Sequence, residues 1–402
     1  MKFTIVTLAV LSVIGSCAAS NGLDEFNNGN HQFTADLYNR LIKGRQDKNF
    51  VFSPLTVAIS LGIARIGANG KSADEITEAV GLPKDNNDLV KSLVQLGEEL
   101  KSDQFKLHQA VGFYTSRDVN VTDSFKTDLE KCRDAKLETV DFSNATDVVE
   151  NINKWVGVQT KHKIKHLLSE DEVSKTSQLV LINAVYFNAT WKHKFTMLPT
   201  KKRFSLSRTN SVMVDMMTVT NHFRYYDLGH IDAKAIELPY EGKDASMVVV
   251  LPNAGYWGDL SNINNNLAKV IEITTADECK DKCSMRDVTV EMPIFSVWAR
   301  YRMQQDLNQL GIETAFSEDA DFTNMADGSI KIHNFIQKAY INVTTEGTVA
   351  TAANDNNVQF RYLSSMRHQT PDRTVFNVQH GFMYYIKLSN TIIMAGKTSH
   401  MR

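Results

Sequence analysis

The order of the expected elements predicts an α+β protein with large β-sheets. Helical patterns come mainly in the first part of the chain, and strand-like runs come mainly in the second part. Residues 179–187 are apolar on both faces, as a central buried strand must be. No Gly/Ser-rich, acidic or repetitive tract interrupts the 402 residues, so we expect one folded domain after the N-terminal segment.

The expected helices have clear boundary signals. Ser53-Pro54 supplies an N-cap and a first-turn proline for an apolar helix that runs to Gly67. Residues 72–75 have the sequence of a capping box, which predicts a short helix that begins there and stops at Gly81. Apolar residues at helical spacing predict two further helices, over residues 33–41 and 149–156.

The expected strands are short runs rich in β-branched and aromatic residues. The last two of them close the chain, after a long polar segment, at residues 375–388 and 391–395. The earlier runs cover residues 107–114, 178–187, 212–219, 233–238, 245–251, 288–298 and 330–343.

The first 19 residues have the pattern of a secretory signal peptide. Lys2 precedes an apolar run over residues 3–14, and small residues lead up to a cleavage site after Ala19. Residues 14–17 also loosely resemble a bacterial lipoprotein cleavage site, which is the alternative. We therefore expect a mature chain of residues 20–402 that is secreted into an extracellular fluid.

Sequons for N-glycosylation fit a secreted chain. They begin at Asn120, Asn144 and Asn188. A fourth begins at Asn342, but it falls in an expected central strand, where we do not expect a glycan.

Charge and cysteine content limit the possible partners of the protein and its possible disulfides. The net charge of −2 argues against nucleic acid as the main partner. Cys279 and Cys283 are close enough in sequence to form a disulfide, which would leave Cys132 over; three thiols without a role are the alternative.

A stretch of small residues near the C-terminus is the most unusual feature of the chain. Its alternate residues Thr348, Ala350 and Ala352 are too small to anchor the segment in a core. The segment could lie exposed as an ordinary loop, or slide between two strands and gain ladder hydrogen bonds there. The stretch consists of Thr345, Glu346, Gly347, Thr348, Val349, Ala350, Thr351, Ala352 and Ala353.

This stretch resembles the hinge of a serpin reactive loop, and motifs along most of the chain resemble the same family in the same order. They are found at residues 49–54, 67–70, 152–156, 183–187, 310–312 and 338–339. The resemblance implies a single domain of three β-sheets and eight or nine helices. It also implies an exposed reactive loop, which with its hinge covers about residues 345–373.

The resemblance assigns roles to several polar residues under the main sheet. Ser53, Thr56 and Asn183 match the family's shutter, a cluster that holds the sheet closed and lets it open when strands part. Gln337 stands where the family commonly has histidine, and a glutamine there resembles arthropod members more than vertebrate ones. Trp191 is expected where the loop first enters the sheet, the region called the breach.

The bond that a protease would cut follows from the family's hinge-to-bond length. Counting from Thr345 gives Arg361–Tyr362, where an arginine would suit a trypsin-like protease. The loop is longer than usual, so Arg367–His368 is an alternative, and cleavage after Tyr362 would suit a chymotrypsin-like protease.

The resemblance therefore implies a suicide-substrate inhibitor of serine proteases that works as a monomer, without cofactor or metal. The polar residues 354–357 are poor strand formers, so a non-inhibitory carrier or storage protein is the alternative. No hydrolase elbow, zinc-protease motif or P-loop supports an enzyme. Basic runs at residues 161–166 and 201–203 leave a glycosaminoglycan partner open.

Overall fold

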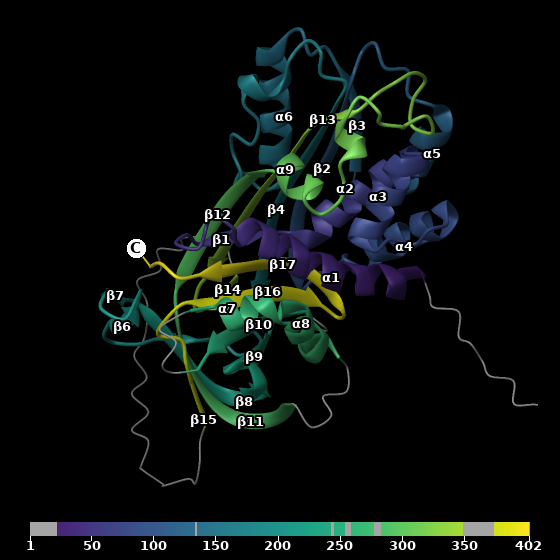
Figure 1. Ribbon diagram of the computed structural model, residues 1–402. Helices are drawn as coiled ribbons and strands as arrows, with labels where there is room; N and C mark the ends of the chain where they lie inside the picture. Colours follow the sequence, from purple (N-terminus) through teal and green to yellow (C-terminus); the bar gives the residue numbers. More distant parts are fainter. Residues whose placement is uncertain are drawn as a thin grey trace, which may run out of the picture.

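The computed structural model describes residues 22–132, 135–242, 245–253, 259–276, 283–348 and 374–401. Within these ranges the chain forms nine α-helices and three β-sheets. One long six-stranded sheet stands above a nine-stranded sheet, with the N-terminal helices gathered on one side (Figure 1). The predicted α+β class, and the implied three sheets with eight or nine helices, are confirmed for the described part of the chain.

The six-stranded sheet contains the strand that the sequence places at the centre. β4 (Leu179–Thr190) is buried along nearly its whole length because its side chains enter two different cores. Leu181 and Val185 face the main core, whereas Val180 and Ile182 face a smaller core under a helix, α6 (Ala145–Gln159). The neighbours in order are β12 (Phe295–Arg302), β13 (Ile332–Val343), β14 (Gly347–Thr348), β4, β2 (Phe105–Ser116) and β3 (Ala135–Val140).

The nine-stranded sheet carries the C-terminal strands and most of the middle of the chain. Its order is β1 (Phe50–Phe52), β17 (Thr391–Thr398), β16 (Phe382–Leu388), β10 (Ala245–Pro252), β9 (Ala233–Pro239), β8 (Met216–Leu228), β11 (Cys283–Pro293) and β15 (Thr374–Asn377). The short strand β5 (Thr196–Met197) pairs with β8, and β6 (Lys202–Ser205) forms a separate hairpin with β7 (Ser211–Val214).

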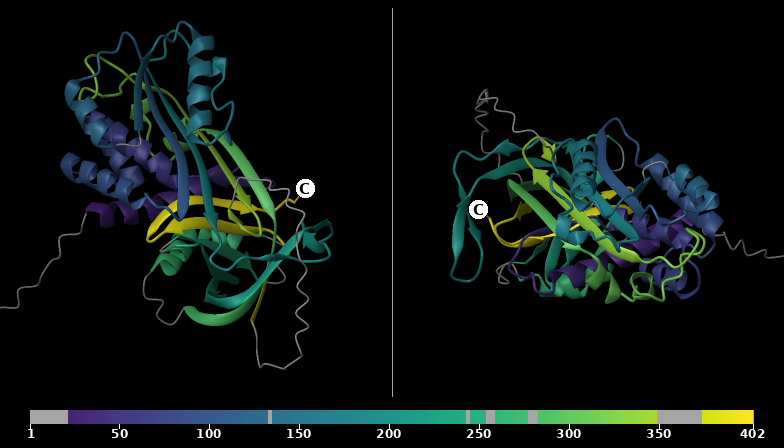
Figure 2. Two further views of the ribbon diagram at one scale, coloured as in Figure 1. Left: turned by 180° about the vertical axis from the view of Figure 1, so that it is seen from behind. Right: turned by 90° about the horizontal axis from the view of Figure 1, so that it is seen from above.

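Helix α2 (Pro54–Gly67) runs through the main core and begins where the sequence predicts. Ser53 is its N-cap, and the Ser53 side chain accepts a hydrogen bond from the Thr56 backbone N–H. The other helices are α1 (Gly22–Ile42), α3 (Gly70–Val80), α4 (Asn86–Glu99), α5 (Asp123–Lys131), α7 (Ser261–Asn265), α8 (Leu267–Thr275) and α9 (Gln304–Asn308) (Figure 2).

The predicted capping box at residues 72–75 is wrong. Helix α3 already begins at Gly70, so both side chains lie inside it and bond to distant parts of the chain. Ser72 Oγ accepts a hydrogen bond from Asp321 N at 3.0 Å. Glu75 Oε2 accepts hydrogen bonds from the backbone N–H groups of Glu313 and Thr314, at 2.9 and 2.7 Å. These two residues fasten the helix to a later loop instead of starting it.

Three predicted strands are each broken in two. The run over residues 212–219 breaks at Asp215, and the run over residues 288–298 breaks at Ile294. Ile294 N donates to Asp215 O at 3.2 Å, so the two breaks lie side by side. At both points the chain passes from one sheet to another, and apolar periodicity does not report such a change. The third run, over residues 375–388, breaks between β15 and β16.

Candidate functional site

The predicted hinge begins in a turn and then enters the main sheet as a short strand. After β13 ends at Val343, the chain turns over Thr344–Gly347, and β14 lies between β13 and β4. Gly347 pairs with Thr190 of β4 and has a φ of +154°. A Cβ atom at this position would stand only 2.0 Å from the carbonyl oxygen of Ala189. The close approach of the two backbones therefore requires glycine at the first inserted residue.

The next residue, Thr348, is completely buried between the two strands. It pairs with Ala189 of β4 and with Val343 of β13, and its Oγ1 lies 2.6 Å from the hydroxyl of Tyr240. Burial raises the pKa of Tyr240, so its hydroxyl stays protonated. A small, hydrogen-bonding residue fits this position, and there is no room in it for a charged one.

Trp191 lies directly against the hinge. Its backbone N–H donates to Glu346 O at 2.8 Å, and its indole Nε1 donates to Thr344 O at 2.9 Å. Phe195 N donates to Thr345 O at 3.0 Å. The indole ring also stacks on the ring of Tyr240, with centroids 4.5 Å apart. The segment that follows β4 thus binds three successive carbonyl groups of the hinge.

Two contacts of the hinge were not predicted from the sequence. Tyr240 directly follows β9, and its hydroxyl contacts Thr348, which lies more than a hundred positions later in the chain. Lys194 Nζ forms an ion pair with Glu346 at 2.7 Å. Both partners of the ion pair are more than half exposed. Neither residue belongs to a recognisable motif, so no signal in the sequence points to them.

The predicted shutter residues Ser53, Thr56 and Gln337 come together under the main sheet. Gln337 Oε1 accepts a hydrogen bond from Ser53 N at 3.1 Å. Its Nε2 donates to Ser53 O at 2.9 Å and to Thr56 Oγ1 at 3.2 Å. All three residues are fully buried, so the amide of β13 holds the start of helix α2 from inside the protein.

Asn183 joins the same cluster from β4. Gln337 and Asn183 are neighbours in the parallel pairing of β13 with β4. Asn183 Nδ2 donates to Ser60 Oγ at 3.2 Å, and Ser60 Oγ donates to Thr56 O at 3.0 Å. Ser53 Oγ in turn donates to Ile393 O of β17 at 2.6 Å. The cluster therefore links the two central strands to helix α2 and to the second sheet.

The reactive segment itself lies outside the described residues. This applies to both candidate bonds and to the later hinge residues, namely Val349, Ala350, Thr351, Ala352, Ala353, Arg361, Tyr362, Arg367 and His368. The structure fixes both ends of that segment. The chain leaves the six-stranded sheet at Thr348 and enters the nine-stranded sheet at Thr374, where β15 pairs in parallel with β11.

The sequons occupy different environments. Asn120 is exposed, and its Nδ2 donates to Asp327 Oδ2 at 2.7 Å. Asn144 is exposed as the N-cap of helix α6, whereas Asn188 and Asn342 are half-buried in central strands. The amides at Asn120 and Asn144 are therefore more accessible than the other two.

The cysteine and histidine residues do not gather into a metal site in the described ranges. Cys283 is disulfide-bonded, so the expectation of three thiols is wrong; Cys279 lies outside the described residues. His162 and His166 are exposed in the loop after α6, with left-handed backbone angles. Within the described parts, no group of three potential ligand side chains could hold a metal ion.

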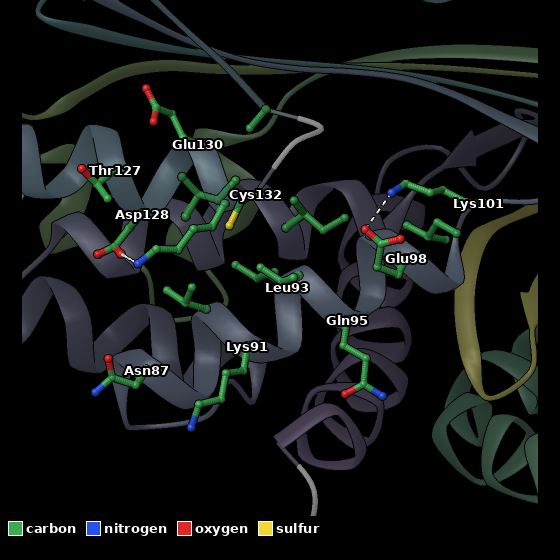
Figure 3. Close-up of a pocket in the computed structure, with 18 residues that line it drawn as sticks. Asn87, Lys91, Leu93, Gln95, Glu98, Lys101, Thr127, Asp128, Glu130 and Cys132 are labelled. Atoms are coloured by element: carbon green, nitrogen blue, oxygen red, sulfur yellow. Dashed lines mark hydrogen bonds and ion pairs between the residues drawn. The ribbon is translucent and has the colours of Figure 1, made fainter.

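A cavity of about 800 Å³ lies between helices α4 and α5 (Figure 3). Leu93 and Cys132 are among the residues that line it. Its lysines are matched by neighbouring carboxylates, since Lys101 pairs with Glu98 and Lys131 pairs with Asp128, each at 2.7 Å. In Figure 1 these helices lie on the side of the molecule away from β14, so the cavity is separate from the hinge.

Helices long and apolar enough to cross a membrane are absent from the described part of the chain.

Comparisons with known proteins agree over nearly the full length. A family model described as "Serpin (serine protease inhibitor)" matches residues 28–401. "Antitrypsin" of Bombyx mori is 26% identical over 396 residues, covering 98% of each chain. "Alaserpin" of Manduca sexta is 30% identical over 353 residues, covering 86% of this chain and 88% of that protein. The structure of Serpin48 of Tenebrio molitor superposes with a TM-score of 0.82 at 29% identity, covering 94% of this chain and 98% of that one.

Proposed function

The chain belongs to the serpin family, and on that premise we propose that it is a secreted suicide-substrate inhibitor of trypsin-like serine proteases. A target protease attacks one bond of the reactive loop and forms an acyl-enzyme. The cut loop then inserts between β13 and β4 and carries the attached protease with it. The inhibitor supplies no catalytic group of its own, so the chain is not an enzyme.

The observation that carries this proposal is the position of β14. Gly347 and Thr348 of the hinge already lie between the strands that must part, and Thr348 is small enough to be buried there. Insertion of the rest of the loop would continue a ladder that has begun, and the alternate small residues Ala350 and Ala352 fit such a path.

The energy available is sufficient for the mechanism. About fifteen inserted residues, at about 0.5–1.5 kcal/mol per new hydrogen bond, would release on the order of 10 kcal/mol. Disturbing the oxyanion hole and triad of a serine protease lowers its rate by about 10³–10⁶-fold. Displacement of the bound protease would therefore leave the acyl-enzyme intact for a long time.

Arg361 is the proposed bait residue, with Arg361–Tyr362 as the scissile bond and Arg367–His368 as the alternative. The arginine side chain would pair with the aspartate at the base of a trypsin-like specificity pocket. The name of the relative "Antitrypsin" is in keeping with this choice. Cleavage after Tyr362 would instead indicate a chymotrypsin-like target.

Secretion and glycosylation complete the proposal. We infer that residues 1–19 are a signal peptide and that residues 20–402 form the mature monomer. Asn120 and Asn144 are the sequons best placed to carry glycans, because both are exposed, and Asn188 is the third. The protein would then meet its target in haemolymph or another body fluid.

A polysaccharide partner is a weaker proposal, which the exposed lysines after helix α6 favour. The run at residues 201–203 is partly neutralised, since Lys201 pairs with Asp215 at 3.4 Å and Lys202 with Glu291 at 3.1 Å. The run at residues 161–166 is the better candidate. If heparin does not change the rate at which trypsin is inhibited, this part of the proposal fails.

The proposal is tested by mixing the purified protein with trypsin and, separately, with chymotrypsin. We expect a complex with trypsin that survives a denaturing gel, and a released peptide that begins at Tyr362. The variant Arg361→Ala should lose complex formation, while the matched variant Arg367→Ala should keep it. The opposite order of the two variants would move the scissile bond to Arg367–His368.

A non-inhibitory carrier or storage protein is the second candidate. The polar residues 354–357 favour it, because some of them would face the core after insertion. Cleavage of the loop without any stable complex would decide for this candidate.

A further inference from the structure

The segment that follows helix α6 lies across the main sheet. Residues 164–173, which we call the crossing segment, bury Ile164, Leu167 and Leu168 in the smaller core together with Ile336 of β13. Helix α6 itself packs over β2, across the line between β13 and β4 but on the same face of the sheet. There Trp155 contacts Tyr114 of β2, with ring centroids 6.2 Å apart. The helix and the crossing segment lie together on one face of the sheet (Figures 1 and 2).

The crossing segment is held to β12 by one buried carboxylate. The Glu172 side chain is only 1% exposed and accepts hydrogen bonds from Arg300 Nη2 and, at 2.6 Å, from Arg302 Nε. Ser169 adds its backbone N–H at 3.0 Å and its hydroxyl at 2.9 Å. Burial acts to raise the pKa of Glu172, but the arginine and serine hydrogen bonds outweigh it and the pKa is lowered.

Backbone carbonyl groups of the crossing segment are bound as well. Arg300 Nε donates to Leu167 O at 2.7 Å, and Lys338 Nζ of β13 donates to Lys165 O at 2.7 Å. Asn334 Nδ2, also from β13, donates to Glu172 O at 2.5 Å. The segment is therefore fastened to both strands on one side of the sheet's centre.

This arrangement spans the line along which the loop would insert. Helix α6 rests on β2, which pairs with β4 along its length, whereas the crossing segment is bound to β12 and β13. When β13 and β4 part, the connection between α6 and these two strands is stretched or must detach. Arginine–carboxylate pairs in a buried setting are the strongest of its attachments.

We propose that Glu172 is a positioning residue which, with Arg300 and Arg302, latches the crossing segment to β12 and sets the rate at which the main sheet admits another strand. This inference rests on the proposed function, because it concerns the same opening of the sheet. It predicts that loosening the latch speeds insertion without changing which protease is recognised.

The test uses a synthetic peptide that copies residues 347–360, added to the intact protein, with its incorporation followed on native gels. Glu172→Gln keeps the shape of the side chain but leaves Arg300 without its carboxylate partner and Arg302 with Asp171 alone. We expect this variant to take up the peptide about tenfold faster than the wild type, which corresponds to about 1.4 kcal/mol in the barrier. Glu170→Gln is the matched control, since Glu170 is exposed in the same turn and should leave the rate unchanged.

Should Glu172→Gln fail to fold, Arg302→Gln serves as a milder variant, because the Arg302 side chain is 58% exposed and contributes only part of the latch. It should speed uptake about threefold. Equal rates for wild type, a folded Glu172→Gln or Arg302→Gln, and Glu170→Gln would overturn the inference. So would a sheet that admits no peptide in any of the four proteins.

Peptide uptake needs no protease, so the latch and the inhibitory function can fail separately. If the variants follow the expected order but trypsin is never trapped, the latch holds and the proposed inhibition is wrong.

Discussion

Strands β4 and β13 meet in two different ways along their length. At one end β14 separates them, and the hinge is held mainly through its backbone, with Trp191 and Phe195 donating to its carbonyl oxygens. Further along, the strands pair directly from Ile332 to Tyr340, and side chains fasten them to helix α2. The same two strands are thus parted at one end and closed at the other.

The difference shows at which end of the two strands the insertion of the loop depends on particular side chains. Backbone carbonyl groups are present whatever the residue. The hinge end therefore requires only small side chains, and glycine at position 347. The closed end depends on particular side chains, since replacing the buried amide of Gln337 leaves its partners without hydrogen bonds. We expect changes at the hinge to abolish insertion and changes at the closed end to lower stability.

Breaking the hinge end should give the largest effect. Thr348→Arg places a charged side chain where Thr348 is completely buried, which costs several kcal/mol and stops the hinge from lying between the strands. We expect trypsin to cut the variant without forming a complex, so that at least tenfold more inhibitor is consumed per protease. Titration of trypsin activity measures this. Thr345→Arg is the control, because Thr345 is only half-buried and an arginine there should be tolerated. Loss of inhibition in this control as well would contradict the account.

Loosening the closed end should lower stability. Gln337→Met keeps the volume of the side chain but removes its hydrogen bonds to Ser53 and Thr56. We expect the free energy of unfolding to fall by about 3 kcal/mol, because several buried polar groups lose their partners. Urea denaturation measures this, with Gln309→Met at the exposed end of helix α9 as the control. A loss equal to that of the control would show that the cluster does not hold the sheet closed.

The latch over the closed end should respond to pH. The pKa of Glu172 is lowered in the folded protein, so its contribution is present above the unfolded value of about 4.5 and is lost as the pH falls through the folded value. We expect wild type to be more stable than Glu172→Gln by about 2 kcal/mol at pH 7. Unfolding curves of both proteins between pH 7 and pH 3 should converge on acidification. A difference that persists at pH 3 would contradict the assignment.

The ion pair beside the hinge should matter least. Lys194 and Glu346 are both more than half exposed, and such pairs contribute about 0–1 kcal/mol. Lys194→Ala should therefore change the unfolding temperature by about 1 °C or less and should leave the inhibition of trypsin intact. A large loss of inhibition would show that the ion pair is needed for loop insertion. It would then contradict the expectation that the hinge is held mainly through its backbone.

The local signals in the sequence predict the parts of the fold that depend on near neighbours. Pro54 and Ser53 fix the start of helix α2, and the double-sided apolar run predicts β4 as a central strand. The smallness of Thr348 predicts that the hinge can enter the sheet. Each of these follows from a few consecutive residues.

The contacts that join distant parts of the chain could not be predicted in this way. Ser72 and Glu75 have the pattern of a capping box, yet they bond to residues more than two hundred positions away. The paired breaks at Asp215 and Ile294 depend on where two sheets meet. Only the resemblance to the family predicts that Gln337 lies beside Ser53, because the neighbours of Gln337 in sequence carry no such signal.

The central claim is that the reactive loop enters the sheet between β13 and β4 once it is cut. The most direct measurement is the unfolding temperature of the intact protein and of the same protein cleaved in its loop by trypsin. New ladder hydrogen bonds worth on the order of 10 kcal/mol should raise the unfolding temperature of the cleaved form by about 10 °C or more. A cleaved form that unfolds at the same temperature as the intact protein, or below it, would show that the loop stays outside the sheet and would contradict the account.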